Sequence, residues 1–159
     1  MFQKILLAAA LAVVSSSALA DSKAPSTAEP AKKEGMTVQQ VLAVWAVLTD
    51  KSFSDFKFSG SVRMALARNI EVASGVQKNF NDRVTENRIN IAGQGKDVPK
   101  DKLDTFNTEN QKMLEAPAFV ALAHIKLSDL CLDAVPPSCP SKNEIPPSML
   151  AALLPIIDQ

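Results

Sequence analysis

The chain has 159 residues, 47% of them hydrophobic, and its 17 lysine and arginine residues balance 17 aspartate and glutamate residues. A neutral chain with one Trp and no Tyr argues against a nucleic-acid partner, because such proteins usually carry a basic stripe and stacking aromatic side chains. The composition agrees with a single small globular domain.

Residues 1–20 have the pattern of a signal peptide. Lys4 gives a positive start, residues 5–14 form an apolar stretch, and Ala18-Leu19-Ala20 is the small-x-small pattern that a signal peptidase cleaves. The apolar stretch is shorter than the roughly 20 residues that span a bilayer, and no Cys follows the cleavage site to accept a lipid. We therefore expect cleavage near Ala20 and an exported protein, periplasmic or secreted, with no stable membrane anchor.

Residues 21–36 have the composition of a flexible linker. They contain Pro25, Pro30 and alternating charges, and Met36 is their only sizeable apolar side chain. Such a stretch cannot bury enough apolar surface to offset the entropy lost on ordering. We expect residues 37–159 to form a single helical domain.

The first helix is predicted to begin at Thr37 and to end near Asp50. Thr37 and Gln40 match a capping box, in which each side chain bonds the other residue's backbone N–H. Apolar side chains then recur at helical spacing. These are Val38, Val41, Leu42, Trp45 and Leu48.

Three phenylalanines, Phe53, Phe56 and Phe58, follow in a polar, serine-rich connection. Aromatic side chains of this size are normally folded back onto a core. The alternative is an exposed patch that binds another protein. The sequence alone leaves both interpretations open.

The strongest helical pattern covers residues 60–89, and a second amphipathic helix is predicted between Val98 and Pro117. Gly93-Gln94-Gly95 separates them, so we expect a long antiparallel helical hairpin within a mainly α bundle. The first helix and the C-terminal segment would cover its apolar faces. The apolar positions of the long helix are Val62, Leu66, Ile70, Ala73, Val76, Phe80 and Val84.

Apolar residues in 119–130 fit both the two-residue period of a strand and the 3.6-residue period of a helix. We favour a short extended or irregular packed segment over a helix. A last short helix is expected to start in residues 145–148 and to be kinked or ended by Pro155. Its inward-facing side chains would be Met149, Leu150, Leu153, Leu154 and Ile157.

Cys131 and Cys139 are the only cysteines. An even number of cysteines in an exported chain predicts a disulfide, here across a short loop that contains Pro136 and Pro137. The chain has no C-x-x-C pattern for redox exchange, and two cysteines with one distant histidine do not make a zinc site. We predict a structural bridge and no metal.

His124 is the only histidine. A Ser-His-Asp hydrolase could use it with Asp129 and a serine, but no nucleophile motif is present. The ordinary alternative is an imidazole without a chemical role. Gly93-Gln94-Gly95 lacks the spacing of phosphate or dinucleotide loops, so we predict no catalytic residue and no cofactor.

Several short sequence motifs in the chain resemble those of a group of small tailed-phage and prophage proteins. They are Lys57-Phe58-Ser59-Gly60, residues 65–70 (ALARNI), Phe106-Asn107-x-Glu109, residues 125–130 (IKLSDL) and residues 145–150 (IPPSML). The resemblance covers most of residues 37–157 and implies the same order of helices, with no activity, cofactor or site residue. The leader and the two cysteines depart from that group, whose members are cytoplasmic or virion-associated.

We therefore expect an exported, non-enzymatic helical module that binds another protein, such as an inhibitor, an immunity protein or an assembly accessory. The alternatives are an exported hydrolase with an unrecognised site and a carrier of a small ligand or lipid. An exposed patch at Phe53, Phe56 and Phe58 would favour the first function. A polar cleft holding His124 would favour the second, and a closed apolar cavity the third.

Overall fold

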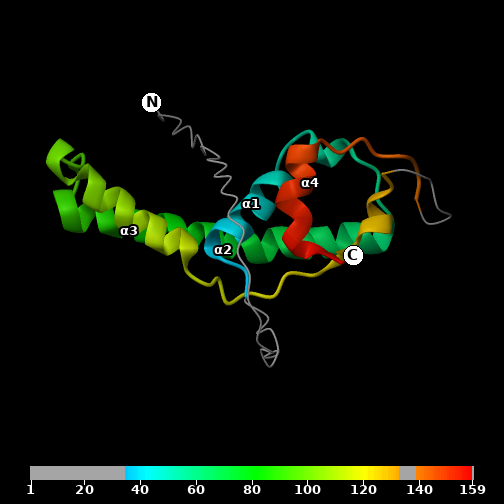
Figure 1. Cartoon of the computed structure of the whole chain (residues 1–159), viewed down its shortest axis with the longest axis horizontal. Helices are drawn as coiled ribbons and strands as arrows, with labels where there is room; N and C mark the ends of the chain where they lie inside the picture. The colour runs from blue at the N-terminus through cyan, green and yellow to red at the C-terminus, as the bar shows by residue number, and fades with distance from the viewer. Residues whose placement is uncertain (1–34, 133–138, 159) are drawn as a thin grey trace, which may run out of the picture. The chain divides into compact units, whose positions relative to one another are not determined.

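The computed structural model describes residues 35–132 and 139–158, which belong to one compact unit. The predicted signal peptide, and the predicted linker up to residue 34, lie outside the described residues. The described part is mainly helical, as predicted (Figure 1). Its elements are α1 (Val38–Leu48), α2 (Gly60–Ala92), α3 (Leu103–Glu115) and α4 (Pro147–Leu153), the 3-10 turns η1 (Phe53–Asp55), η2 (Lys100–Lys102), η3 (Leu127–Leu130) and η4 (Leu154–Ile156), and the strands β1 (Ile125–Lys126) and β2 (Ile157–Asp158).

The capping box at the start of α1 is confirmed. The Gln40 backbone N–H donates to Thr37 Oγ1 at 3.3 Å, and the Thr37 N–H donates to Gln40 Oε1 at 2.9 Å. Val41, Val44 and Leu48 are the buried side chains of this helix. Local sequence thus fixes where α1 begins. Of the predicted apolar positions, Val41 and Leu48 are buried, Val38, Leu42 and Trp45 are half-buried, and buried Val44 was not predicted.

α2 begins after Ser59, whose hydroxyl accepts the Val62 N–H at 3.4 Å. It runs three residues beyond the predicted end at Ile89 and stops at Gly93, where φ is +89°. A left-handed φ favours glycine, and Gly95, at φ +73°, turns the chain again. Gly93 therefore ends the longest helix, and both glycines adopt backbone angles that favour glycine in the turn that follows.

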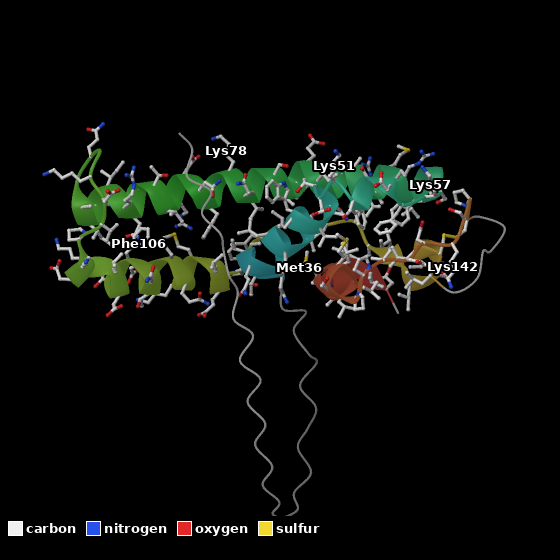
Figure 2. All side chains as sticks on the ribbon, turned by 90° about the horizontal axis from the view of Figure 1, so that it is seen from above. Met36, Lys51, Lys57, Lys78, Phe106 and Lys142 are labelled. Atoms are coloured by element: carbon white, nitrogen blue, oxygen red, sulfur yellow. A yellow bond between two sulfur atoms is a disulfide. The ribbon has the colours of Figure 1, made fainter. Side chains whose placement is uncertain are left out.

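The core lies where α1 packs against the N-terminal half of α2 on one side and against α4 on the other (Figure 2). Fully buried side chains come from several elements, so no two elements alone form the core. The most enclosed apolar residues are Val41, Val44, Ala73, Leu130, Leu153 and Ile156.

α3 lies alongside the C-terminal half of α2 (Figure 2). The Asn87 side-chain amide donates to Asn110 Oδ1 at 3.0 Å, which joins the two helices through their polar side chains. None of the residues of α3, all of which the structure describes, is buried. The core therefore does not extend into this part of the molecule.

Residues 117–130 are extended or irregular, as favoured from the sequence, with a short strand and a 3-10 turn. β1 pairs with β2 in parallel, so that Ile125 lies opposite Ile157. At the other end, the Ala118 N–H donates to the Met36 carbonyl at 2.8 Å. Met36 also packs against the core, so the folded part begins at least one residue before the predicted boundary at Thr37.

The prediction that Leu154 faces inward is wrong, because its side chain is 56% exposed and Ile156 is fully buried instead. After Leu153 the helix tightens into η4. A 3-10 turn has three residues per turn instead of 3.6, so the residue three positions after buried Leu153 shares its side. The change in helix type moves the apolar face from Leu154 to Ile156.

Candidate functional site

An open groove of about 480 Å³ lies between α2, the C-terminal end of α3 and residues 116–120. Its walls are mainly apolar, with a few polar side chains among them. The groove is lined by Val38, Val72, Gly75, Val76, Asn79, Phe80, Arg83, Met113 and residues 116–120. A concave apolar surface with a few polar groups is the usual form of a binding site.

Phe119 lines this groove, yet its side chain is 91% exposed. Its backbone φ is +48°, in the left-handed region that bulky residues rarely adopt. Such a conformation costs about 1 to 3 kcal/mol and persists only where the surrounding structure imposes it. The fold therefore holds a large apolar side chain in solvent beside an apolar groove, at a cost in folding stability.

Residues on both sides of Phe119 are fixed in place. On one side Ala118 is bonded to Met36, and Val38 N–H donates to the Ala116 carbonyl at 2.9 Å. On the other side Asn69, 1% exposed on α2, accepts the Ala123 N–H at 2.7 Å and donates to the Ala123 carbonyl at 2.8 Å. These anchors hold the segment that carries Phe119 against α2.

A second, more open hollow of about 700 Å³ continues along α2 beside residues 121–123 and shares Val72 and Gly75 with the groove. Arg68 and Glu71 lie in its lining. A Cβ atom placed on Gly75 would have no other heavy atom within 4 Å, apart from its two chain neighbours and the backbone of its own helix. Gly75 therefore leaves the surface open between the two hollows.

The three phenylalanines pack together on the core instead of forming an exposed patch. The Phe53 ring centroid lies 5.6 Å from those of Phe56 and Phe58. Phe53 and Phe58 are buried, and Phe56 is half-buried. With Arg63 they line a small hollow of about 220 Å³, so the first of the two interpretations from the sequence agrees with the structure.

Cys131 and Cys139 form the predicted disulfide. Beside it, the buried Asn143 holds a distant segment in the way that Asn69 does: its Oδ1 accepts the Lys57 N–H at 2.9 Å and its amide donates to the Lys57 carbonyl at 2.8 Å. The Asn143 N–H also donates to the Cys131 carbonyl at 2.9 Å. The bridge and this amide together fix the chain that leads into α4.

His124 pairs with Asp158 and not with the Asp129 considered from the sequence. Its Nδ1 lies 2.9 Å from Asp158 Oδ1, and both side chains are at least half exposed. Within residues 35–132 and 139–158, no serine hydroxyl bonds the ring and no three potential ligands gather to hold a metal ion. The pair joins the residue just before β1 to the last residue of β2.

The carboxylate of Asp50 is held by hydrogen bonds from the turn that follows it. It accepts hydrogen bonds from the hydroxyl and the backbone N–H of Ser52. The bond from the Ser52 hydroxyl, followed by the one from its N–H, favours the charged form and lowers the pKa of Asp50. The Phe53 N–H donates to the Asp50 backbone carbonyl at 3.1 Å. Asp50 is fully exposed, so the effect stabilises the turn before η1 and suggests no chemistry.

Neither Phe119 nor the two buried asparagines was singled out from the sequence. Asn69 occupies a position of the apolar stripe of α2, three residues after Leu66 and four before Ala73, and a polar residue there is the signal that could have identified it. Phe119 gives no such signal, because its backbone conformation depends on contacts made elsewhere in the fold.

Comparison of the chain with protein-family models, with curated proteins and with solved structures finds no match. Among the described residues, no helix is long and apolar enough to cross a membrane.

Proposed function

We propose that the protein is an exported, non-enzymatic helical module that binds another protein through the groove beside Phe119, as an inhibitor, an immunity protein or an assembly accessory would. The observation that carries this proposal is the exposed Phe119 at φ +48° on the edge of the apolar groove. Aromatic anchors next to apolar pockets contribute a large share of the energy of protein interfaces.

The surroundings of the groove support a protein segment as the ligand. Arg83 lies in the lining, and no carboxylate of the described residues pairs with it. An apolar floor with an arginine at its edge has the composition of an interface core and rim. A partner segment with apolar side chains and a carboxylate would complement both.

The finer fold that we propose is a bundle built on a long antiparallel hairpin of α2 and α3. The Asn87 bond to Asn110 supports it, and so does the Lys102 ammonium, which donates to the Ile91 carbonyl at 3.3 Å across the turn. In this arrangement the base of the hairpin forms one wall of the groove.

Export is supported by the signal-peptide pattern of residues 1–20 and by the disulfide, which persists in oxidising compartments. Two observations weigh against the hydrolase alternative: His124 lines none of the hollows described above, and its partner is a surface aspartate. Carriage of an apolar ligand is the second candidate, because the groove is apolar and has room for an acyl chain.

Site-specific photo-cross-linking tests the proposal. A benzoylphenylalanine is placed at residue 119 or, as a matched control, at Met64, which is 69% exposed on α2 and does not line the groove. We expect an adduct with a second protein in the periplasmic fraction from residue 119 and none from residue 64. Mass spectrometry then identifies the partner.

The purified partner allows a quantitative test. Phe119→Ser should weaken its binding by about thirtyfold, the effect of losing about 2 kcal/mol at an interface anchor, while Met64→Ser should leave it unchanged. Equal binding by both variants would contradict the proposal. Saturable binding of a fluorescent fatty acid that Phe119→Ser abolishes, without a protein adduct, would favour the carrier function.

A further inference from the structure

The part of the molecule formed by residues 76–115 lacks a covering layer. We call it the distal arm; it comprises the C-terminal half of α2, the turn and α3. No side chain of α2 beyond Ala73 is buried, and none of α3 is. α1 lies near α3, but both views show the turn end of α2 and α3 with no other described helix beside it (Figures 1 and 2).

The apolar side chains of the distal arm face the junction between the two helices but remain partly accessible there. Val84 and Ile91 of α2, and Phe106 of α3, are half-buried, and Leu103 is 40% exposed. Short helices gain most of their stability from packing an apolar face. Two helices can cover each such side chain on one side only, so the distal arm offers an apolar seam to further helices.

The middle of this seam carries a pair of amides, each of which keeps one polar atom accessible to solvent. Asn87 Nδ2 donates to Asn110 Oδ1 at 3.0 Å and to the Phe106 carbonyl at 3.5 Å. Neither Asn87 Oδ1 nor Asn110 Nδ2 has a hydrogen-bond partner among the described residues. One is an acceptor and the other a donor, so a second copy of the same pair would satisfy both.

The charges on the two helices are also complementary. Residues 76–92 of α2 carry three basic and two acidic side chains, whereas α3 carries one basic and three acidic side chains. Packing α3 of one copy against α2 of another therefore brings opposite net charges together. Packing like helices against each other would not.

We infer that the distal arm is a dimerisation surface on which a second copy of this chain packs, so that two arms form a four-helix bundle. A two-fold axis at the level of Asn87 and Asn110 lets Asn110 Nδ2 of each copy donate to Asn87 Oδ1 of the other. Such reciprocal contacts define an isologous interface, and a polar pair inside a helical bundle fixes its register. The base of the distal arm also lines the groove, but the seam around Asn87 and Asn110 lies nearer the turn and lines none of it. The inference does not rest on the proposed function.

Sedimentation equilibrium of the purified full chain tests the inference. The wild-type protein should reach twice the mass of one chain as its concentration rises. Asn110→Asp keeps the oxygen that accepts from Asn87 within the chain but replaces the donor with a second oxygen. It should therefore weaken the dimer by about tenfold or more without changing the fold.

Leu103→Lys should abolish the dimer, because it places a charge in the seam. Ile89→Lys is the matched control: Ile89 is 38% exposed, close to the 40% of Leu103, but lies two residues from both Asn87 and Ile91 and hence on the opposite face of α2. It should leave the dimer intact, and circular dichroism melts should show both variants folded. A wild-type protein that stays monomeric at every concentration, or a dimer that Asn110→Asp and Leu103→Lys leave unchanged, would overturn the inference.

Discussion

Asn69 and Ala123 are 54 residues apart, and the side chain of one binds both backbone polar groups of the other. An asparagine amide presents an acceptor and a donor at the spacing of a peptide group, so it can replace the neighbouring strand that an extended segment would otherwise need. Through this contact α2 holds the chain that carries Phe119.

The first prediction concerns this contact. Asn69→Ala leaves the N–H and the carbonyl of Ala123 without a protein partner and should lower the free energy of unfolding by about 2 to 3 kcal/mol. Urea denaturation followed by circular dichroism measures this loss. Asn79→Ala, an exposed position of the same helix, is the control and should change stability by less than about 0.5 kcal/mol.

The second prediction separates the apolar positions of α2. Leu66 is buried in the core, and its truncation to Ala should cost about 2 to 5 kcal/mol. Phe80 belongs to the same sequence pattern but is half-buried in the groove lining. Phe80→Ala should therefore cost less than about 2 kcal/mol, and thermal melts of both variants make the comparison. An equal loss of stability would show that the groove is closed in solution.

The third prediction concerns the disulfide. Replacing Cys131 and Cys139 by Ser removes the cross-link of an eight-residue separation, which by chain-entropy arguments costs roughly 2.5 kcal/mol. Thiol titration of the wild-type protein under denaturing, non-reducing conditions should find no free thiol. Two reactive thiols in freshly isolated material would instead give the pair another role.

The fourth prediction is a pH effect at Asp50. Because its pKa is lowered in the folded state, its hydrogen bonds stabilise the turn above the ordinary Asp value of about 3.9, and this contribution is lost as the pH falls through the folded-state pKa. An NMR titration should therefore place the Asp50 midpoint below the ordinary value. Ser52→Ala should raise it.

Ser54→Ala provides the control for this titration. The Ser54 hydroxyl donates to the Lys51 carbonyl at 2.6 Å and not to Asp50, so its removal should leave the Asp50 midpoint in place. An unchanged midpoint in Ser52→Ala would show that the hydroxyl does not hold the carboxylate in solution.

The helices could be predicted because their signals are local. The Thr37–Gln40 capping box and the three-and-four spacing of Val62, Leu66 and Ala73 depend on residues within one or two turns of each other. The disulfide followed from the cysteine count and the signal-peptide pattern of residues 1–20. For the helices, the physical cause lies within a short stretch of chain.

The site could not be predicted because its causes are distant in sequence. Phe119 adopts φ +48° between anchors at Met36 and Asn69. Asn143 binds Lys57, 86 residues earlier. Even the misassigned Leu154 reflects a non-local cause, since η4 brings Ile157 into register with Ile125. The periodicity of apolar residues along the sequence carries no information about these long-range contacts.

The parallel pairing of β1 with β2 bears on when the protein can fold during its synthesis. Ile156 and Ile157 are buried, and Ile157 pairs with Ile125, which α1 and α2 precede in the chain. Domains generally fold as units. We therefore expect the core to close only after residues 156–158 have been made. For the export that we propose, the chain would then cross the membrane before its core closes.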